Sequence, residues 1–397
     1  MSDYHFQSEI AETNRATIIR RDAQTNARVA KPRVLMVGMH LTKTRGGITT
    51  LIAEILKSPL KDDFEFIYIE SQAEDFGKFG KLFLAFGAVF RFIFNCLWKR
   101  PKLVYVHLGS NASLYRESVF IFLAKLFGKK TVAHFHAGDI DNYFPFQSRA
   151  GQKFIRAALN LSDKLIAVSQ ESARQLRDLT NSTNVSVIAN AIDTSIFKRD
   201  FAAENKLDDR TIRLLFVGAV GKLKGERDLI KALAILRGRQ PNININIKVS
   251  FLGYGAENLK DYCEESGISE FVEHLGAVSM SERIDFYRKA DIFVLPTYAE
   301  AMPMSVIEAM AAGLAIITTN VGGIPELIED DAHGILFSPG DTETLAEKIL
   351  FLLENENIRI DIGRKAREKA QAQMDFKTYA EKLRAHLSAA CDSEIEI

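Results

Sequence analysis

The sequence repeats, twice, an alternation of short apolar runs with longer amphipathic segments, and this pattern limits its fold more than any other feature. Six runs rich in β-branched or apolar residues lie at 34–37, 64–69, 103–106, 131–135, 165–168 and 185–188. After a loop at 190–206, six more follow at 213–217, 245–252, 271–275, 292–295, 315–318 and 335–337. Such alternation predicts buried parallel strands with helices on both faces of each sheet. The chain is therefore predicted to form two doubly wound α/β domains in tandem, with a cleft between them.

The boundaries of these domains follow from the same pattern. Residues 1–30 carry few apolar side chains and no period, so we interpret them as a disordered tail. Residues 31–200 are expected to form the first domain and residues 201–374 the second. Apolar spacing predicts helices at 341–353 and 358–387, and we expect a C-terminal helix at 375–390 to complete the first domain. With 397 residues, 47% of them hydrophobic, the chain can fill more than one core.

The charge balance narrows the choice of partner. The 51 Lys and Arg residues are matched by 51 Asp and Glu residues, so the net charge of zero gives no indication of nucleic-acid binding. The charge is unevenly distributed along the chain, because residues 31–200 carry a net charge of +9 and residues 201–397 a net charge of −9. We therefore expect the two halves to face different partners.

Cysteine usage and the N-terminal composition favour the cytoplasm. Three cysteines, far apart and odd in number, offer neither a complete disulfide framework nor metal-ligand spacing: Cys96, Cys263 and Cys391. The first thirty residues contain no apolar run suited to a signal peptide. The apolar stretch 76–98 is not predicted to be a transmembrane helix, because polar residues interrupt it: Lys78, Lys81, Arg91 and Asn95.

The residues best suited to chemistry follow the apolar run 292–295. Ligands bind beyond the carboxyl ends of parallel strands, where loops and helix N-termini converge. Pro303 suits the first turn of a helix and Gly313 its end, so we predict a helix over 303–312 whose N-terminus seats a diphosphate. Glu300 precedes this helix, and Glu308 lies within it, where a carboxylate can accept hydrogen bonds from two ribose hydroxyls. Taken alone, two glutamates more often belong to a solvated loop and an ordinary helix surface.

The sequence around these glutamates resembles a known family. Residues 300–313 read EAMPMSVIEAMAAG, and residues 321–326 read VGGIPE. Together they resemble the retaining glycosyltransferases of family 4, which have the GT-B fold of two Rossmann-like domains. The resemblance continues through 190–193, 216–218, 224–225, 251–255 and 274–276, and covers nearly all of residues 185–370.

This resemblance implies a function and a donor site in the second domain. A sugar would move from a nucleotide-diphosphate sugar, UDP- or GDP-linked, to a saccharide or lipid-linked acceptor bound by the first domain, with retention and without cofactor or metal. Glu308 would hold the ribose, Glu300 a hydroxyl of the donor sugar, and Lys224 the diphosphate. The backbone around the sugar and phosphates would come from Gly218, Gly253, Met302, Pro303, Met304 and Ser305. The family's usual roles favour bacterial surface polysaccharide synthesis.

One position departs from the family pattern. The family usually places an arginine directly after the strand glycine, whereas this chain reads Gly218-Ala219. Lys222 could take over part of its role, but a lysine is a point charge and cannot form a bidentate clamp. The alternative is that Lys222 is a solvated loop residue.

The first domain offers fewer candidate residues. Gly46 and Gly47 follow the first strand and precede a helix, where glycine lets the backbone approach a phosphate or sugar. His136, at the end of the strand 131–135, matches the family histidine at the sugar end of the cleft. His134 is more simply interpreted as a core histidine, and His107 is a further candidate.

Two features of the first domain have competing interpretations. Asp139 and Asp141 resemble the metal-binding aspartate pair of another glycosyltransferase class, but we prefer an acceptor-side or N-capping role. Aromatic residues at helical spacing in 76–100, flanked by lysine and arginine, fit peripheral contact with an anionic membrane at its cytoplasmic face. The alternative for this stretch is a helix packed on the sheet.

Rival functions also remain open at this point. A sugar-nucleotide epimerase or a phosphorylase could share the architecture, although no pyridoxal-binding lysine is identified for a phosphorylase. A non-catalytic partner subunit would also retain this fold, and the missing arginine at Ala219 is consistent with it.

Overall fold

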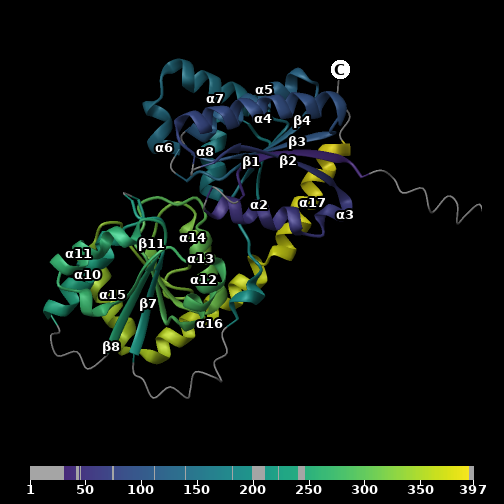
Figure 1. The fold of residues 1–397 in the computed structure, drawn as a ribbon. Helices are drawn as coiled ribbons and strands as arrows, with labels where there is room; N and C mark the ends of the chain where they lie inside the picture. The colour runs from purple at the N-terminus through teal and green to yellow at the C-terminus, as the bar shows by residue number, and fades with distance from the viewer. Residues whose placement is uncertain are drawn as a thin grey trace, which may run out of the picture.

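The structure is a computed structural model with two α/β domains (Figure 1). It describes residues 31–392 except 42–43, 45, 74–75, 111, 139, 181, 199–210, 222 and 240–245, and it does not describe the side chains of residues 78 and 142. Residues 1–30, Asp139 and Lys222 therefore lie outside the described residues. Each domain contains a parallel six-stranded sheet, which confirms the predicted fold class.

The first sheet has the order β2-β1-β3-β4-β5-β6. Its strands are β1 (Arg33–Met39), β2 (Glu65–Gln72), β3 (Leu103–Leu108), β4 (Lys130–Phe135), β5 (Lys164–Ala167) and β6 (Val185–Val187). Every strand pairing in it is parallel. Because side chains alternate along a strand, a strand such as β1 contributes to two separate cores. Val34 and Met36 belong to one core, and Leu35 and Val37 belong to the other.

Helices cover both faces of this sheet. One face carries α2 (Gly47–Lys57), α3 (Leu60–Asp63) and α17 (Phe376–Asp392). The other carries α4 (Lys78–Trp98), α5 (Ala112–Leu126), α7 (Arg149–Leu161) and α8 (Gln170–Thr180), and the short α6 (Ile140–Tyr143) follows β4. Figure 1 shows α4, α5 and α7 on the side of the first domain that is turned away from the second.

The second sheet has the order β12-β11-β10-β7-β8-β9. Its strands are β7 (Thr211–Val217), β8 (Asn246–Leu252), β9 (Val272–Gly276), β10 (Ile292–Leu295), β11 (Ala315–Thr319) and β12 (Ile335–Phe337). Its helices are α10 (Glu226–Arg239), α11 (Lys260–Glu265), α12 (Met280–Lys289), α13 (Met304–Ala312), α14 (Ile324–Leu327), α15 (Thr342–Glu354) and α16 (Glu356–Gln373).

The chain crosses between the domains twice, and the crossings lie side by side. The amide of Ile192 donates to Met374 O at 3.1 Å, and the amide of Phe376 donates to Ile192 O at 2.9 Å. The single helix predicted over 358–387 is therefore wrong: α16 ends before this crossing, and α17 begins after it. The helix breaks because its backbone groups here pair with the other crossing segment. Figure 1 shows α17 running from the second domain back to the first.

Candidate functional site

Helix α13 begins where the sequence places it, at the carboxyl edge of the second sheet. Pro303 occupies the N-cap with φ −71° and ψ 119°, and Gly313 ends the helix in the left-handed conformation at φ 77°. The predicted helix therefore starts one residue too early: Pro303 precedes the observed helix α13 (Met304–Ala312), because its extended ψ excludes it from the first turn. The first amide groups of α13 have no partner within the helix and supply the partial positive charge expected of a helix N-terminus.

Segment 300–304 lies against the first domain. A Cβ placed on Gly47, at the N-terminus of α2, would lie 2.6 Å from Met304 Cγ. A Cβ placed on Gly138, in the loop after β4, would lie 2.2 Å from Ala301 N. These glycines mark two loops of the first domain that contact the start of α13. The backbone here is further fixed by Asn190, whose Nδ2 donates to Met302 O at 2.8 Å.

The loop that follows β11, in the same domain, contacts the backbone of Glu300. Gly322 has φ 55°, and a Cβ on it would lie 1.6 Å from Glu300 O. The amide of Gly323 donates to that same oxygen at 3.3 Å. The motif 321–326 therefore positions Glu300 through backbone contacts that only glycine at Gly322 permits.

The structure pairs Lys224 with Glu300. Lys224 Nζ donates to Glu300 Oε1, and the two side chains are 31% and 11% exposed. Lys224 lies between β7 and α10, next to Gly218, while Glu300 lies 76 residues further along the chain. The two residues predicted to hold donor phosphate and donor sugar are therefore direct neighbours.

Glu308 is buried and ion-paired. Its Oε1 lies 3.0 Å from a guanidinium nitrogen of Arg283 on α12, and its side chain is only 3% exposed. Burial raises the pKa of Glu308, while the Arg283 charge and a hydrogen bond from Tyr287 lower it. The sequence reasoning missed Arg283, since nothing in the chain around it indicates that α12 packs beside α13.

Gly218 and Gly253 end adjacent strands and contact each other. A Cβ on Gly253 would lie 2.0 Å from Gly218 O, so these predicted binding residues let the ends of β7 and β8 approach closely. Ala219, which follows, carries no charge. Lys222, the proposed substitute for the missing arginine, lies outside the described residues.

Three histidines gather at the carboxyl ends of β3 and β4. His136 Nε2 lies 3.0 Å from His107 Nδ1, and His134 Nδ1 lies 2.7 Å from the hydroxyl of Tyr105. Burial lowers the pKa of His136 to about 3, so its imidazole is neutral at physiological pH. His134 lies fully buried within the sheet, as its core interpretation predicts.

The three rings of the histidine group lie close together and nearly parallel. Its nitrogen atoms lie within 4.8 Å of one another. The three imidazole planes are 19° to 30° apart, and His107 and His136 are hydrogen-bonded to each other. The group is therefore a hydrogen-bonded stack.

Asp141 already has a charged partner. Its Oδ2 lies 3.0 Å from a guanidinium nitrogen of Arg174 and accepts a hydrogen bond from Gln175 at 3.3 Å. Asp139, the other member of the predicted pair, lies outside the described residues.

Helix α4 exposes a row of aromatic side chains. Its inner face buries Ala88, Phe92 and Cys96 against the first sheet. Its outer face leaves Phe79, Phe83, Phe86, Phe90, Phe94 and Trp98 between 45% and 88% exposed. Among the described residues, it is the one helix long and apolar enough to cross a membrane by length and composition, and 17% of that stretch is buried. The packing interpretation of 76–100 is thus confirmed for one face of the helix, whereas membrane contact of the exposed face stays a prediction.

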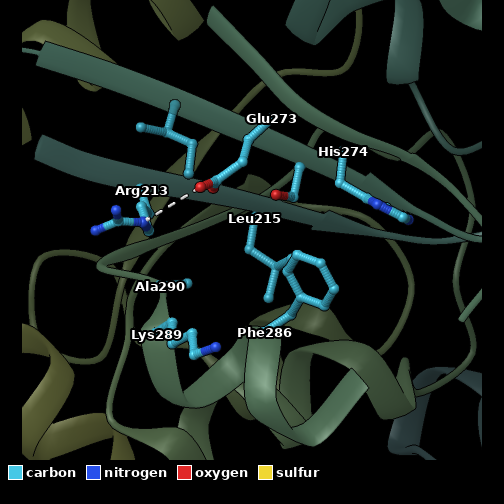
Figure 2. Close-up of a pocket in the computed structure, with 9 residues that line it drawn as sticks. Arg213, Leu215, Glu273, His274, Phe286, Lys289 and Ala290 are labelled. Carbon is cyan, nitrogen blue, oxygen red and sulfur yellow. Dashed lines mark ion pairs between the residues drawn. The ribbon is translucent and has the colours of Figure 1, made fainter. Parts of the chain in front are cut away.

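The second domain also has a cavity of about 240 Å³ away from this site (Figure 2). It is lined by Arg213 and Leu215 of β7, Glu273 and His274 of β9, and Phe286 of α12, with Arg213 and Glu273 3.7 Å apart. Arg213 lies near the amino-terminal end of β7 and Glu273 near that of β9, whereas Gly218 follows the opposite end of β7. None of the residues predicted for the donor site lines this cavity.

Two family descriptions match consecutive parts of the chain. The family described as Glycosyltransferase Family 4 matches residues 46–196, and the family described as Glycosyl transferases group 1 matches residues 197–369. The two matches together run through both domains.

Curated relatives are similar over part of their length. The D-inositol 3-phosphate glycosyltransferase of Arthrobacter sp. (strain FB24) is 29% identical over 241 residues, which are 59% of this chain and 57% of that protein. The glycogen synthase of Mycobacterium tuberculosis is 26% identical over 268 residues, which are 66% of this chain and 63% of that protein. The chain spans about half the length of the curated relatives it matches.

Solved structures share the fold. Sucrose-phosphate synthase from Thermosynechococcus elongatus matches with a TM-score of 0.76 and 17% identity, covering 91% of this chain and 100% of that one. HepE from Anabaena, solved in complex with UDP-glucose, matches with a TM-score of 0.70 and 20% identity, covering 90% and 99%. At these identities the similarity is one of architecture.

Proposed function

The chain belongs to glycosyltransferase family 4 and is a glycosyltransferase with the GT-B fold, and on this premise we propose that it transfers a sugar, with retention, from a UDP- or GDP-linked donor to a saccharide or lipid-linked acceptor. The proposal of a nucleotide-diphosphate sugar as donor is supported mainly by the pairing of Lys224 with Glu300 beside the N-terminus of α13. A lysine, unpaired helix amides and a carboxylate match the diphosphate and the hydroxyls of such a donor.

The proposed reaction breaks the bond between the sugar anomeric carbon and the diphosphate oxygen. Negative charge grows on the departing diphosphate, and Lys224 with the α13 amides stabilises it. The acceptor hydroxyl oxygen bonds to the anomeric carbon on the same face and passes its proton to the leaving phosphate. The products are a glycoside and a nucleoside diphosphate. Glu300 and His136 bind and orient the sugar, and Glu308 binds the ribose.

A two-step experiment tests this proposal. A thermal-shift screen with UDP- and GDP-sugars identifies the donor, because a ligand selective for the folded state raises the unfolding temperature. Release of nucleoside diphosphate from that donor then reports turnover. Glu300→Gln should lower turnover at least 100-fold, whereas Glu257→Gln, a matched change at an exposed glutamate of the same domain, should leave it unchanged. No shift and no turnover across the panel, even with acceptor extracts, would instead support the non-catalytic partner subunit.

We further propose that the enzyme is cytoplasmic and contacts an anionic membrane through α4, as suits bacterial surface polysaccharide synthesis on lipid-linked acceptors. The aromatic row of α4 exposes Phe83 to 85% and Phe90 to 73%. The helix contains no acidic residue, and exposed Lys81, Lys99 and Arg100 lie along it and at its end. Aromatic bulk beside cationic side chains suits the interface of a bilayer that carries negative lipids.

Vesicle co-sedimentation tests the membrane contact. Vesicles of phosphatidylglycerol and phosphatidylcholine should retain the protein at low salt and less of it at higher salt, because salt screens exposed charges. Replacing Phe83, Phe86 and Phe90 by serine should abolish binding. Phe146→Ser, at a phenylalanine that is 85% exposed outside α4, should not. Failure of the wild type to bind at low salt, or dimerisation through this face, would contradict the proposal.

A further inference from the structure

His107 and His136 are connected across neighbouring strands. In the β3–β4 pairing His107 lies opposite His134, and beyond β4 the amide of His136 donates to Leu108 O at 2.9 Å. This register brings His107 Nδ1 within 3.0 Å of His136 Nε2. The Nε2 of His136 is therefore occupied, and Nδ1 is the ring atom left for a ligand. Two residues further on, Gly138 contacts Ala301 beside Glu300, so His136 lies at the boundary between the domains.

The hydrogen bond requires that one of the two rings donates a proton and the other accepts. Burial lowers the pKa of both imidazoles, so each is neutral and carries one N–H. Which ring donates depends on the second nitrogen of His107. That atom, Nε2, is buried without a hydrogen-bond partner among the described residues.

The unpartnered nitrogen selects one arrangement. A proton on His107 Nε2 would be a buried N–H donor without an acceptor, which folded proteins rarely tolerate. An unprotonated Nε2, whose lone pair lacks a donor, costs less free energy than an N–H that lacks an acceptor. The proton of His107 therefore belongs on Nδ1, from which it is donated to His136 Nε2, and the proton of His136 belongs on its own Nδ1.

We propose that His107 is a positioning residue that fixes His136 as the Nδ1–H tautomer. His136 then offers a hydrogen-bond donor to the bound sugar or the leaving phosphate. With no lone pair free on either nitrogen, it cannot accept a proton from the acceptor hydroxyl. The claim that this N–H binds the sugar or the leaving phosphate rests on the proposed function. The claim that His136 is the Nδ1–H tautomer does not.

Nitrogen NMR measures the tautomer directly. The protein has 8 histidines, so 15N-histidine labelling gives a small set of ring signals, and His136→Gln identifies those of His136. Between pH 7 and 8 we expect protonated Nδ1 and unprotonated Nε2 in the wild type. Protonated Nε2 would overturn the proposal. The NMR measurement does not require an active enzyme. An inactive protein with the expected tautomer would therefore contradict the proposed function and leave this inference intact.

Variants test the positioning role. His107→Phe removes the donor, and His136 should become a mixture of tautomers with at least 10-fold lower kcat. His107→Asn places an amide N–H where Nδ1 stands and should restore the Nδ1–H tautomer and most of the activity. His134→Phe is the matched control, since His134 stacks on His136 with ring centroids 4.2 Å apart, and it should leave the tautomer unchanged. An unchanged tautomer in His107→Phe would refute the role of His107. If that variant fails to fold, the wild-type spectrum decides.

Discussion

Replacing Lys224 by methionine separates the charge of this residue from its contribution to folding. The change keeps an unbranched side chain and removes the ammonium group. Among the residues that the structure describes, Lys224 forms its ion pair with Glu300, and the Lys224 side chain is 31% exposed. An ion pair of this exposure contributes about 0.2–1 kcal/mol to stability. We therefore expect the free energy of unfolding to fall by no more than about 1 kcal/mol.

The effect on catalysis should be far larger. A single preorganised donor aimed at developing charge is worth roughly 2.7–4 kcal/mol, or about 100- to 1000-fold in kcat. The absence of the family arginine at Ala219 leaves Lys224 with a greater share of this task. We expect Lys224→Met to lower kcat within this range.

The assay compares three proteins. Wild type, Lys224→Met and Lys231→Met are measured for nucleoside diphosphate release and for unfolding in urea; Lys231 is an exposed lysine on α10 and serves as the matched control. Lys231→Met should behave as wild type. A loss of less than about 10-fold in kcat with folding intact would refute the role of Lys224 in stabilising the leaving diphosphate.

Three further predictions follow from the contacts. Glu308→Gln removes the charge beside Arg283 and should raise the donor KM about 10- to 150-fold, since a hydrogen bond to a charged group is worth about 1.5–3 kcal/mol. Initial rates measured against donor concentration give this KM. An unchanged KM would contradict the role of Glu308 in binding the ribose. Gly322→Ala should displace Glu300 and lower turnover, whereas Gly221→Ala, where a Cβ meets nothing within 4 Å, should not. Burial holds the pKa of His134 and His136 below the 6.5 of an unfolded histidine, so the unfolded chain takes up protons that the folded chain does not. The free energy of unfolding should fall as pH drops from 6.5 toward 3, by about 1.4 kcal/mol per pH unit for each histidine. Urea unfolding at pH 7 and pH 5 measures this loss of stability, which should be smaller in His134→Phe than in the wild type. An equal loss in both proteins would refute the lowered pKa of His134.

Local patterns predicted the architecture and the position of the central helix. Short apolar runs and amphipathic segments identify strands and crossover helices because burial on one or both faces determines their periodicity. Helix α13 could be located because Gly313 adopts the left-handed conformation that ends a helix. The break between α16 and α17 was not predicted, since it depends on pairing with Ile192, a residue far away in the sequence.

The sequence by itself determined two doubly wound domains and the set of acids, glycines and lysine around α13, because chain-local propensity, caps and spacing encode them. Only the tertiary structure decided which side chains meet. The pairs Lys224–Glu300, Glu308–Arg283 and His107–His136 join segments whose distance in space depends on strand order, register and helix packing. The same holds for α4, whose composition is apolar on both faces, since packing on the first sheet selects which face remains exposed.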